Sequence, residues 1–216
     1  MADNLQPRAR PPRQVIEGRY CRLDPLDPIR HGDDLFETSM AEGAEQRFRY
    51  LTDASPSDRA TFDAWIAQES TSQDPLYWAV IDRATGRCGG RQALMRIAPE
   101  HGVMEIGRIL WNPPIARSRV ATEALYLHAC FVFEELGYRR LEWKCDARHK
   151  KSRRAAMRFG FALEGIFRQH MIVKGESRDT AWFAILDKEW PAIRSRFDLW
   201  LDPANFDGRG RQLSKL

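Results

Sequence analysis

The sequence predicts a single α/β (α+β) domain: a mixed, mostly antiparallel sheet with helices on both faces and a βαβ crossover at its centre. Its 216 residues, 43% of them hydrophobic, are enough to bury one sizeable core. The apolar residues follow a helical repeat in the first part of the chain and a strand repeat from residue 76. After three consecutive strands, a helix leads to a fourth strand, which is the order of a crossover unit.

The first elements are bounded by proline and by capping residues. A short strand lies within 19–26, and a helix over 29–40 follows Pro28, because proline is tolerated in the first helical turn. The next helix begins after Ser57 or Asp58, either of which can cap it. The apolar side expected of the first helix consists of Ile29, Leu35, Phe36 and Met40, and that of the second of Phe62, Trp65 and Ile66.

Three strands are expected in succession over 76–82, 88–97 and 102–111. A turn at Gly86 joins the first two as an antiparallel pair. Gly107 interrupts the side-chain pattern of the third strand, and a glycine in such a position indicates a bulge or a close approach of another group.

The second half of the chain alternates helices and strands. A helix over 119–136 ends at a glycine, a strand over 138–146 follows, and a second helix spans 150–159. Two strands then form a long hairpin about Gly175, and a closing helix covers 188–201. The crossover helix joins the third and fourth of the central strands, so these two are expected to be parallel.

The chain divides into three parts. Residues 1–17 are expected to be a flexible basic arm, 18–192 the folded domain, and 193–216 the end of the closing helix and a basic tail. No stretch of about 18 apolar residues occurs, so no membrane partner is expected. The first residues also lack the apolar run of a signal peptide.

The numbers and spacing of cysteines and histidines indicate the cellular compartment and whether a metal site is expected. The four cysteines are scattered without a CxxC pair, and the five histidines show no ligand spacing. Free thiols in a reducing cytoplasm fit this pattern better than disulfides or a zinc site. We therefore expect a cytoplasmic protein without a metal.

Positive charge is concentrated in one run. The formal net charge of +4 is compatible with an anionic ligand, but it is not a nucleic-acid signature by itself. The run over 148–158 fits the solvated face of a helix, or a ribosome- or RNA-binding module. No aromatic residue interleaves it before Phe159, so nucleic acid is not the expected partner. The basic residues of this run are Arg148, Lys150, Lys151, Arg153, Arg154 and Arg158.

The stretch WNPPIARSRVATEA, residues 111–124, puts two cations at the start of a helix. Arg117 and Arg119 stand where unpaired N–H groups already carry partial positive charge. Such an arrangement predicts an anionic ligand at this turn.

The same stretch carries a family resemblance. ATEA (121–124), SRRAAMRFGF (152–161) and DTAWFAILDKEW (179–190) resemble the GNAT N-acetyltransferases, nearest the ribosomal-protein alanine N-acetyltransferase (RimJ/RimL-like) type, over about residues 18–192. The resemblance implies the GNAT fold and an acetyl-coenzyme A (acetyl-CoA)-dependent N-acetyltransferase. The acyl group would pass by direct attack of a primary amine, which is either a protein N-terminus or a small molecule.

The resemblance also implies a coenzyme site. In the family, backbone N–H groups of the turn before the central helix bind the pyrophosphate. Here Arg117 and Arg119 replace the usual glycines, and arginine keeps the N–H groups while adding guanidinium donors. His149 stands at the family's asparagine position, and Arg153 or Lys151 is implied as a partner of the 3′-phosphate. The implied coenzyme residues are Arg117, Ser118, Arg119, Val120, Ala121, Thr122, His149, Ser152 and Arg153.

Two residues are candidates for catalysis. Glu105 is the only acid of its strand and would act as the base that deprotonates the amine, or it is a solvent-facing strand residue. The family's usual tyrosine acid is replaced by Ala156, so Ser152 is implied as the proton donor to the leaving thiolate; otherwise it is an ordinary helix cap.

The replaced glycines and the missing tyrosine also allow a second function, a GNAT-fold coenzyme-binding protein with impaired catalysis. The acceptor, the length of the acyl group and the oligomeric state, monomer or homodimer, are left open by the sequence.

Overall fold

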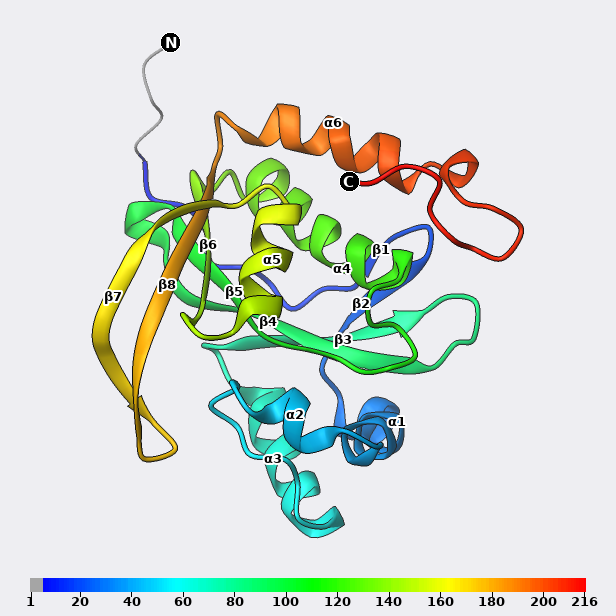
Figure 1. Ribbon diagram of the computed structural model, residues 1–216, viewed down its shortest axis with the longest axis vertical. Coiled ribbons are helices and arrows are strands. Elements are labelled where there is room, and N and C mark those ends of the chain that lie inside the picture. Colours follow the sequence, from blue (N-terminus) through cyan, green and yellow to red (C-terminus); the bar gives the residue numbers. More distant parts are fainter. Residues whose placement is uncertain (1–5) are drawn as a thin grey trace.

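One eight-stranded sheet runs through the computed structural model, which describes residues 6–216 (Figure 1). The strand order is β1-β2-β3-β4-β5-β6-β8-β7, and only β5 and β6 pair in parallel. The strands are β1 (Ile16–Glu17), β2 (Cys21–Pro25), β3 (Leu76–Asp82), β4 (Cys88–Ala98), β5 (Val103–Trp111), β6 (Arg140–Asp146), β7 (Ala162–Val173) and β8 (Glu176–Leu186). The predicted mixed sheet and its crossover are confirmed.

Helices cover both faces of this sheet. In Figure 1, α1, α2 and α3 lie on one side, and α4, α5 and α6 lie on the other. The helices are α1 (Pro28–Met40), α2 (Ala44–Phe48), α3 (Arg59–Thr71), α4 (Arg119–Cys130), α5 (Lys150–Arg158) and α6 (Trp190–Leu201), with short helical turns at Pro99–His101, Phe131–Glu135 and Pro203–Asn205.

Strand β3 shows why both faces are covered. Its residues alternate between two apolar clusters, so Tyr77 lies in the cluster with residues of α1 and α3 while Trp78 packs against His128 of α4. Both side chains are almost completely buried. A strand that is apolar on both sides requires helices on both faces of the sheet.

The helices differ from the expected ones mainly in the extent of α4 and in the buried side of α1. The helix expected over 119–136 is α-helical only to Cys130 and continues as a π-helical turn over Phe131–Glu135. The expected apolar stripe of α1 is wrong at Ile29, which is 94% exposed, and at Met40, which is also exposed. The buried side of α1 instead runs through His31, Leu35 and Ser39, which follow one another at four-residue spacing. Cap Asp58 of α3 is as expected.

The segment expected to be a flexible arm lies along the domain over residues 6–17. Arg8 N donates to Pro99 O (2.9 Å), Tyr138 Oη donates to Ala9 O (3.0 Å), and Trp78 Nε1 donates to Gln14 O (2.9 Å). The first five residues of that expected arm lie outside the described part of the chain.

The parallel pair at the sheet centre is short. Strands β5 and β6 are paired only from Val103–Arg140 to Glu105–Glu142, although both continue further. Beyond Glu105 the two strands part, which opens the centre of the sheet at their carboxyl ends. None of the helices within residues 6–216 combines the length and the apolar character needed to cross a bilayer.

Candidate active site

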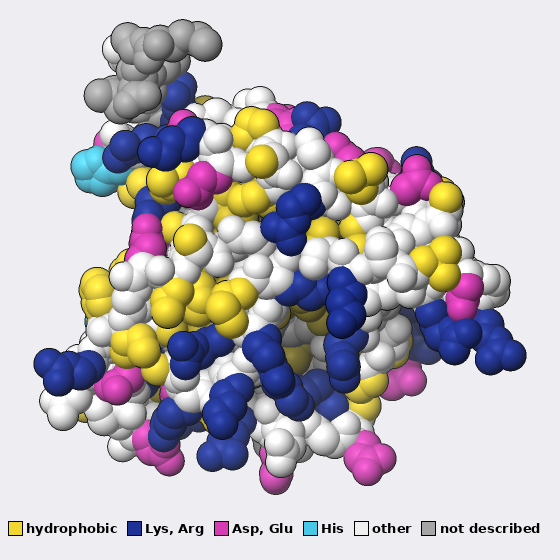
Figure 2. Space-filling model, turned by 45° about the horizontal axis from the view of Figure 1, so that its top comes forward, with side chains coloured by type: hydrophobic (Ala, Val, Ile, Leu, Met, Phe, Trp, Pro, Cys, Tyr) yellow, Lys and Arg dark blue, Asp and Glu magenta, His cyan; other side chains and the backbone are white. Residues whose placement is uncertain are grey.

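A cleft of about 1100 Å³ opens where β5 and β6 part. Its walls come from β5, the turn before α4, helix α5, the β7–β8 hairpin and the C-terminal segment. Figure 2 shows Lys and Arg side chains gathered around a hollow on one face of the molecule. Because ligands of α/β folds bind where the carboxyl ends of neighbouring strands diverge, this cleft is the candidate site.

Glu105 faces the cleft from the last residue pair shared by β5 and β6. Its side chain is 7% exposed, and Oε2 lies 3.1 Å from Arg96 Nε and 3.1 Å from Lys144 Nζ. Burial raises the pKa of Glu105, while the Lys144 charge opposes this rise. Glu105 is therefore a buried carboxylate in the cleft and not a solvent-facing strand residue.

Lys144 is a site residue that the sequence analysis missed. Its side chain is 6% exposed, and Nζ lies between Glu105 and the Oε2 of Glu142, 2.6 Å away. The same Nζ lies 3.8 Å from the centre of the Trp182 ring. The signal was the strand alternation of β6, which puts Glu142 and Lys144 on the face opposite Trp143.

The bulge expected at Gly107 is present in β5. Gly107 pairs with Ala93 and Leu110 pairs with Arg91, so β5 takes one residue more than β4 over this stretch. Arg108, inside the bulge, has φ +51°. A Cβ on residue 107 would lie 2.8 Å from Met95 Sδ and 3.3 Å from Glu105 Oε1, so the expected close approach is also confirmed.

The turn before α4 has the backbone that the family resemblance leads one to expect. Arg117 has φ +63°, the left-handed region that favours glycine. Ser118 is the N-cap, and its Oγ accepts hydrogen bonds from Val120 N (3.1 Å) and Ala121 N (3.5 Å). Thr122 Oγ1 donates to Ser118 O (3.0 Å) and is buried. The helix start is thus ordered by its own side chains.

All but one of the residues predicted from this turn line the cleft. Arg117, Ser118, Arg119, Ala121 and Thr122 line it. Val120 is buried in the core beneath the helix and is not a lining residue.

Five cations surround this end of the cleft. Two come from the turn and three from α5, and none of them forms an ion pair with a carboxylate within residues 6–216. An uncompensated group of cations beside a helix N-terminus suits a ligand with several negative charges. The five are Arg117, Arg119, Lys151, Arg154 and Arg158.

Residues His149 and Ser152 lie where the cleft meets α5. His149 is the N-cap of α5, where its Nδ1 accepts from Ser152 N (3.4 Å), and its ring stacks on Tyr50 with centres 4.4 Å apart. Burial lowers the pKa of His149, which favours the neutral ring. Ser152 is therefore not the cap of α5, and its Oγ instead accepts from Trp143 Nε1 (3.0 Å).

Arg153 points elsewhere. Its Nη1 donates to Ala147 O (3.3 Å), and it is not among the residues that line the cleft. Of the two cations implied as partners of a 3′-phosphate, only Lys151 faces the cleft. Helical spacing explains why Arg153 does not line the cleft: Arg154 and Arg158, four residues apart, share one face of α5, and Arg153 lies on another.

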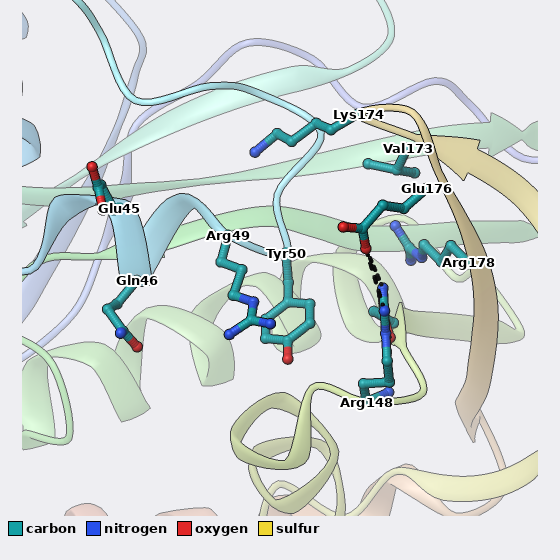
Figure 3. Close-up of a pocket in the computed structure, with 10 residues that line it drawn as sticks. Glu45, Gln46, Arg49, Tyr50, Arg148, Val173, Lys174, Glu176 and Arg178 are labelled. Carbon is teal, nitrogen blue, oxygen red and sulfur yellow. Dashed lines mark hydrogen bonds and ion pairs between the residues drawn. The ribbon is translucent and has the colours of Figure 1, made fainter.

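A second, smaller cavity of about 410 Å³ adjoins the cleft. It lies between α2 with the residues that follow it and the β7–β8 hairpin (Figure 3). Tyr50 and Arg178 line both cavities. On its far side Arg148 pairs with Asp146 (2.9 Å) and with Glu176 (3.3 Å). The two cavities therefore meet at Tyr50 and Arg178.

The described residues hold no candidate metal centre. Within residues 6–216, no group of three or more His, Cys, Asp and Glu side chains is arranged to hold an ion. The four cysteines are free.

Comparison with known proteins gives the family. The family model described as "Acetyltransferase (GNAT) domain" matches residues 23–162, about two thirds of the chain. No curated protein sequence matches the chain.

Solved structures agree with this match. A GCN5-related N-acetyltransferase from Brucella melitensis is 55% identical, with a TM-score of 0.96, and the match covers 98% of this chain and 96% of that one. A GNAT-family protein from Chromobacterium violaceum is 35% identical, with a TM-score of 0.81, over 88% and 95% of the two chains.

An acetyltransferase from Salmonella typhimurium, which modifies the N-terminal serine of a 50S ribosomal subunit protein, is 16% identical. Its TM-score is 0.70, over 80% of this chain and 99% of that one, so it shares the fold. The family match and the two more similar structures together show that this chain belongs to the GNAT acetyltransferase family and is an acyltransferase.

Proposed function

We propose that this protein is an acetyl-CoA-dependent N-acetyltransferase that transfers the acetyl group by direct attack of a primary amine. The observation that carries the proposal is the arrangement of charge in one cleft. Uncompensated cations surround the start of α4, and a buried carboxylate, Glu105, faces the same cleft from β5. Coenzyme A supplies the matching features, with phosphates at one end and a thioester at the other.

The coenzyme's diphosphate is assigned to the turn before α4. The positive end of the helix dipole and the side chains of Arg117 and Arg119 favour an anion there. The Ser118 side chain already binds two of the first N–H groups, so the guanidinium groups supply part of the attraction. Charge-assisted hydrogen bonds of this kind contribute roughly 1.5–3 kcal/mol each.

Glu105 is assigned the role of base. An ammonium group cannot attack a thioester, so one proton must leave the acceptor, either directly or through a water. Burial makes the Glu105 carboxylate more basic, and the ion pairs to Lys144 and Arg96 fix its position. Its Oε1 lies on the side of Gly107, next to the bulge. Backbone N–H groups of the bulge are assigned to the thioester oxygen, which gains negative charge during attack.

Ser152 is assigned the role of proton donor to the leaving thiolate. The indole N–H of Trp143 can only donate, so it takes up an acceptor site of Ser152 Oγ and leaves the hydroxyl proton free to be donated. Within the chain that proton is directed to Cys145, whose thiol pKa the Ser152 hydrogen bond lowers against the larger effect of burial. A thiolate entering the cleft would compete for the same proton.

The acceptor is assigned to the side of the smaller cavity, which meets the cleft at Tyr50 and Arg178. Both a protein N-terminus, as in the RimJ/RimL-like branch, and a small-molecule amine fit the proposal. A panel of amines, peptides with free N-termini included, assayed for thiol released from acetyl-CoA, separates these classes. The same assay tests the second function, since a catalytically impaired coenzyme-binding protein would bind acetyl-CoA without amine-dependent thiol release. A cytoplasmic location is part of this proposal.

A further inference from the structure

The C-terminal lobe, residues 200–216, consists of the last two residues of α6 and the chain that follows them, lies beside the start of α4 and forms one wall of the cleft. Figure 1 shows the chain turning back in a wide loop after α6. The segment lies outside the stretch matched by the family model, which ends at residue 162. From the sequence, a basic tail was expected here. Five residues of the lobe line the cleft: Trp200, Phe206, Gly210, Arg211 and Gln212.

The lobe is ordered by specific contacts. Asn205 is buried, with Nδ2 donating to Trp200 O (2.9 Å) and Oδ1 accepting from both Ser214 N (2.8 Å) and Ser214 Oγ (2.7 Å). Trp200 Nε1 donates to Gln212 Oε1 (3.1 Å), and Phe206 and Gln212 form a β-bridge. These hydrogen bonds give the lobe a defined conformation.

The lobe orients two of the uncompensated cations. The Arg119 guanidinium carbon lies 4.5 Å from the centre of the Tyr20 ring and 5.5 Å from that of Phe206. The Arg158 guanidinium carbon lies 4.9 Å from the centre of the Trp200 ring. Aromatic contacts hold both groups in place without neutralising their charge.

Arg158 is half-buried and has no carboxylate partner within residues 6–216. Its Nη1 donates to Thr122 Oγ1 (3.3 Å) at the start of α4. Burial lowers the pKa of Arg158, and a bound anion would offset this effect. Arg158 thus links the helix start, where the diphosphate is assigned, to the aromatic wall of the lobe.

We infer that the C-terminal lobe binds the adenosine 3′-phosphate portion of coenzyme A, with Phe206 contacting the adenine and Arg158 the 3′-phosphate. The inference rests on the proposed function, because it assumes coenzyme A in the cleft. Coenzyme A carries beyond its diphosphate a flat aromatic base and a further phosphate. Phe206 and Arg158 both contact Trp200, whose ring centre lies 5.1 Å from that of Phe206 and 4.9 Å from the Arg158 guanidinium carbon. An aromatic side chain and a positioned cation that share one neighbour are complementary to that base and phosphate. The lobe is therefore a determinant of specificity for coenzyme A over shorter thioesters.

Calorimetry on the full chain tests this with three ligands: acetyl-CoA, its 3′-dephospho form and 4′-phosphopantetheine, which lacks the adenosine. For the parent protein, loss of the 3′-phosphate should weaken binding at least tenfold. Arg158→Gln should bind acetyl-CoA and the 3′-dephospho form with equal affinity, because removing either partner removes the same interaction. If the variant keeps the full tenfold preference, the 3′-phosphate binds elsewhere and the inference is overturned.

Phe206→Ala provides the second variant, with Leu213→Ala as its matched control. Leu213 lies in the same lobe, is exposed and does not line the cleft. Phe206→Ala should weaken acetyl-CoA binding about tenfold, as expected for a lost base–aromatic contact. The affinity for 4′-phosphopantetheine, which lacks the adenine, should not change. Equal weakening of both ligands would mean a general structural effect and would overturn the inference. Failure of the parent to bind acetyl-CoA at millimolar concentration would instead overturn the proposed function itself.

Discussion

Lys144 reaches Glu105 from the neighbouring parallel strand, with Nζ 3.1 Å from Oε2, and both side chains are buried. The pair lies at the point where β5 and β6 separate, so it joins the two strands at the edge of the cleft. Arg96 from β4 and Glu142 from β6 complete the charged surroundings of Glu105. The ionisation of the proposed base is therefore set by the strands that form the cleft.

Lys144→Met should shift the pH dependence of catalysis. The Lys144 charge lowers the pKa of Glu105, so its removal raises that pKa. The rate of a reaction that needs the Glu105 carboxylate rises with pH through this pKa, so the acid limb of the kcat/KM profile should move to higher pH. Lys144→Arg, which keeps the charge, should restore the parent profile. An acid limb that stays in place in the Met variant would show that Lys144 does not act on the base.

Glu105→Gln should lower turnover by roughly 10²-fold or more, as expected for loss of a general base. Acetyl-CoA affinity should stay close to that of the parent, because the proposed phosphate contacts come from the turn before α4 and from α5 and not from Glu105. Steady-state kinetics and calorimetry measure the two quantities separately. Near-parental turnover would assign Glu105 a structural role only.

The left-handed backbone conformation of Arg117 allows the effect of its charge on coenzyme binding to be measured separately from the effect of its backbone strain on stability. A residue with a side chain in this region costs about 1 kcal/mol or more relative to glycine, so Arg117→Gly should raise the free energy of unfolding of the empty protein by up to about 1 kcal/mol. It should also weaken acetyl-CoA binding, because a cation near the diphosphate is lost.

Arg117→Gln is the control for this change, because it removes the charge but keeps the side-chain strain. Arg117→Gln should weaken acetyl-CoA binding about as much as Arg117→Gly does, but it should not raise the free energy of unfolding. The paired change Arg117→Gln, Arg119→Gln should weaken acetyl-CoA binding at least tenfold, which corresponds to a loss of about 1.4 kcal/mol in binding free energy. Unchanged affinity of the pair would mean that backbone N–H groups alone bind the phosphates.

Glu123 holds the chain turn before β2 against α4. Its carboxylate accepts hydrogen bonds from Arg19 N (2.9 Å), Tyr20 N (2.6 Å) and Cys21 N (2.7 Å). Hydrogen bonds to charged groups are worth roughly 1.5–3 kcal/mol each, so Glu123→Gln should lower the free energy of unfolding by about 2–4 kcal/mol. Chemical denaturation measures this, with the exposed Glu100→Gln as a control expected within about 0.5 kcal/mol of the parent. A Glu123→Gln loss as small as that of the control would contradict the role.

The fold could be predicted where local signals were strong. Alternation over 76–82, the glycine turn at Gly86 and the hairpin at Gly175 gave the strands, and all three are confirmed. The two-residue β1 and the five-residue α2 are too short to show any period. The buried side of α1 was wrong at Ile29 because hydrophobicity alone does not determine which face of a helix meets the sheet. In α1 the polar residues His31 and Ser39 lie on the buried face.

The site could be predicted where a residue's role follows from its own element. Glu105 and the turn residues at the start of α4 are of this kind, and they line the cleft. Lys144 needed the register between β5 and β6, which no local pattern gives. The contact of Arg119 with Phe206 joins residues far apart in the chain, so only the folded structure shows it. The carboxylate of Glu123 likewise binds backbone N–H groups of a segment far away in the chain, which no pattern within α4 indicates.

The central claim is that one cleft holds acetyl-CoA and delivers its acetyl group to an amine. The most direct measurement is thiol release from acetyl-CoA by the purified protein across the amine panel, with the acetylated amine quantified in the same samples. We expect thiol release that depends on the amine, matches the acetylated product in amount, and falls about 10²-fold in Glu105→Gln. Thiol release that is independent of every amine, or bound acetyl-CoA with no acetylated product, would contradict it.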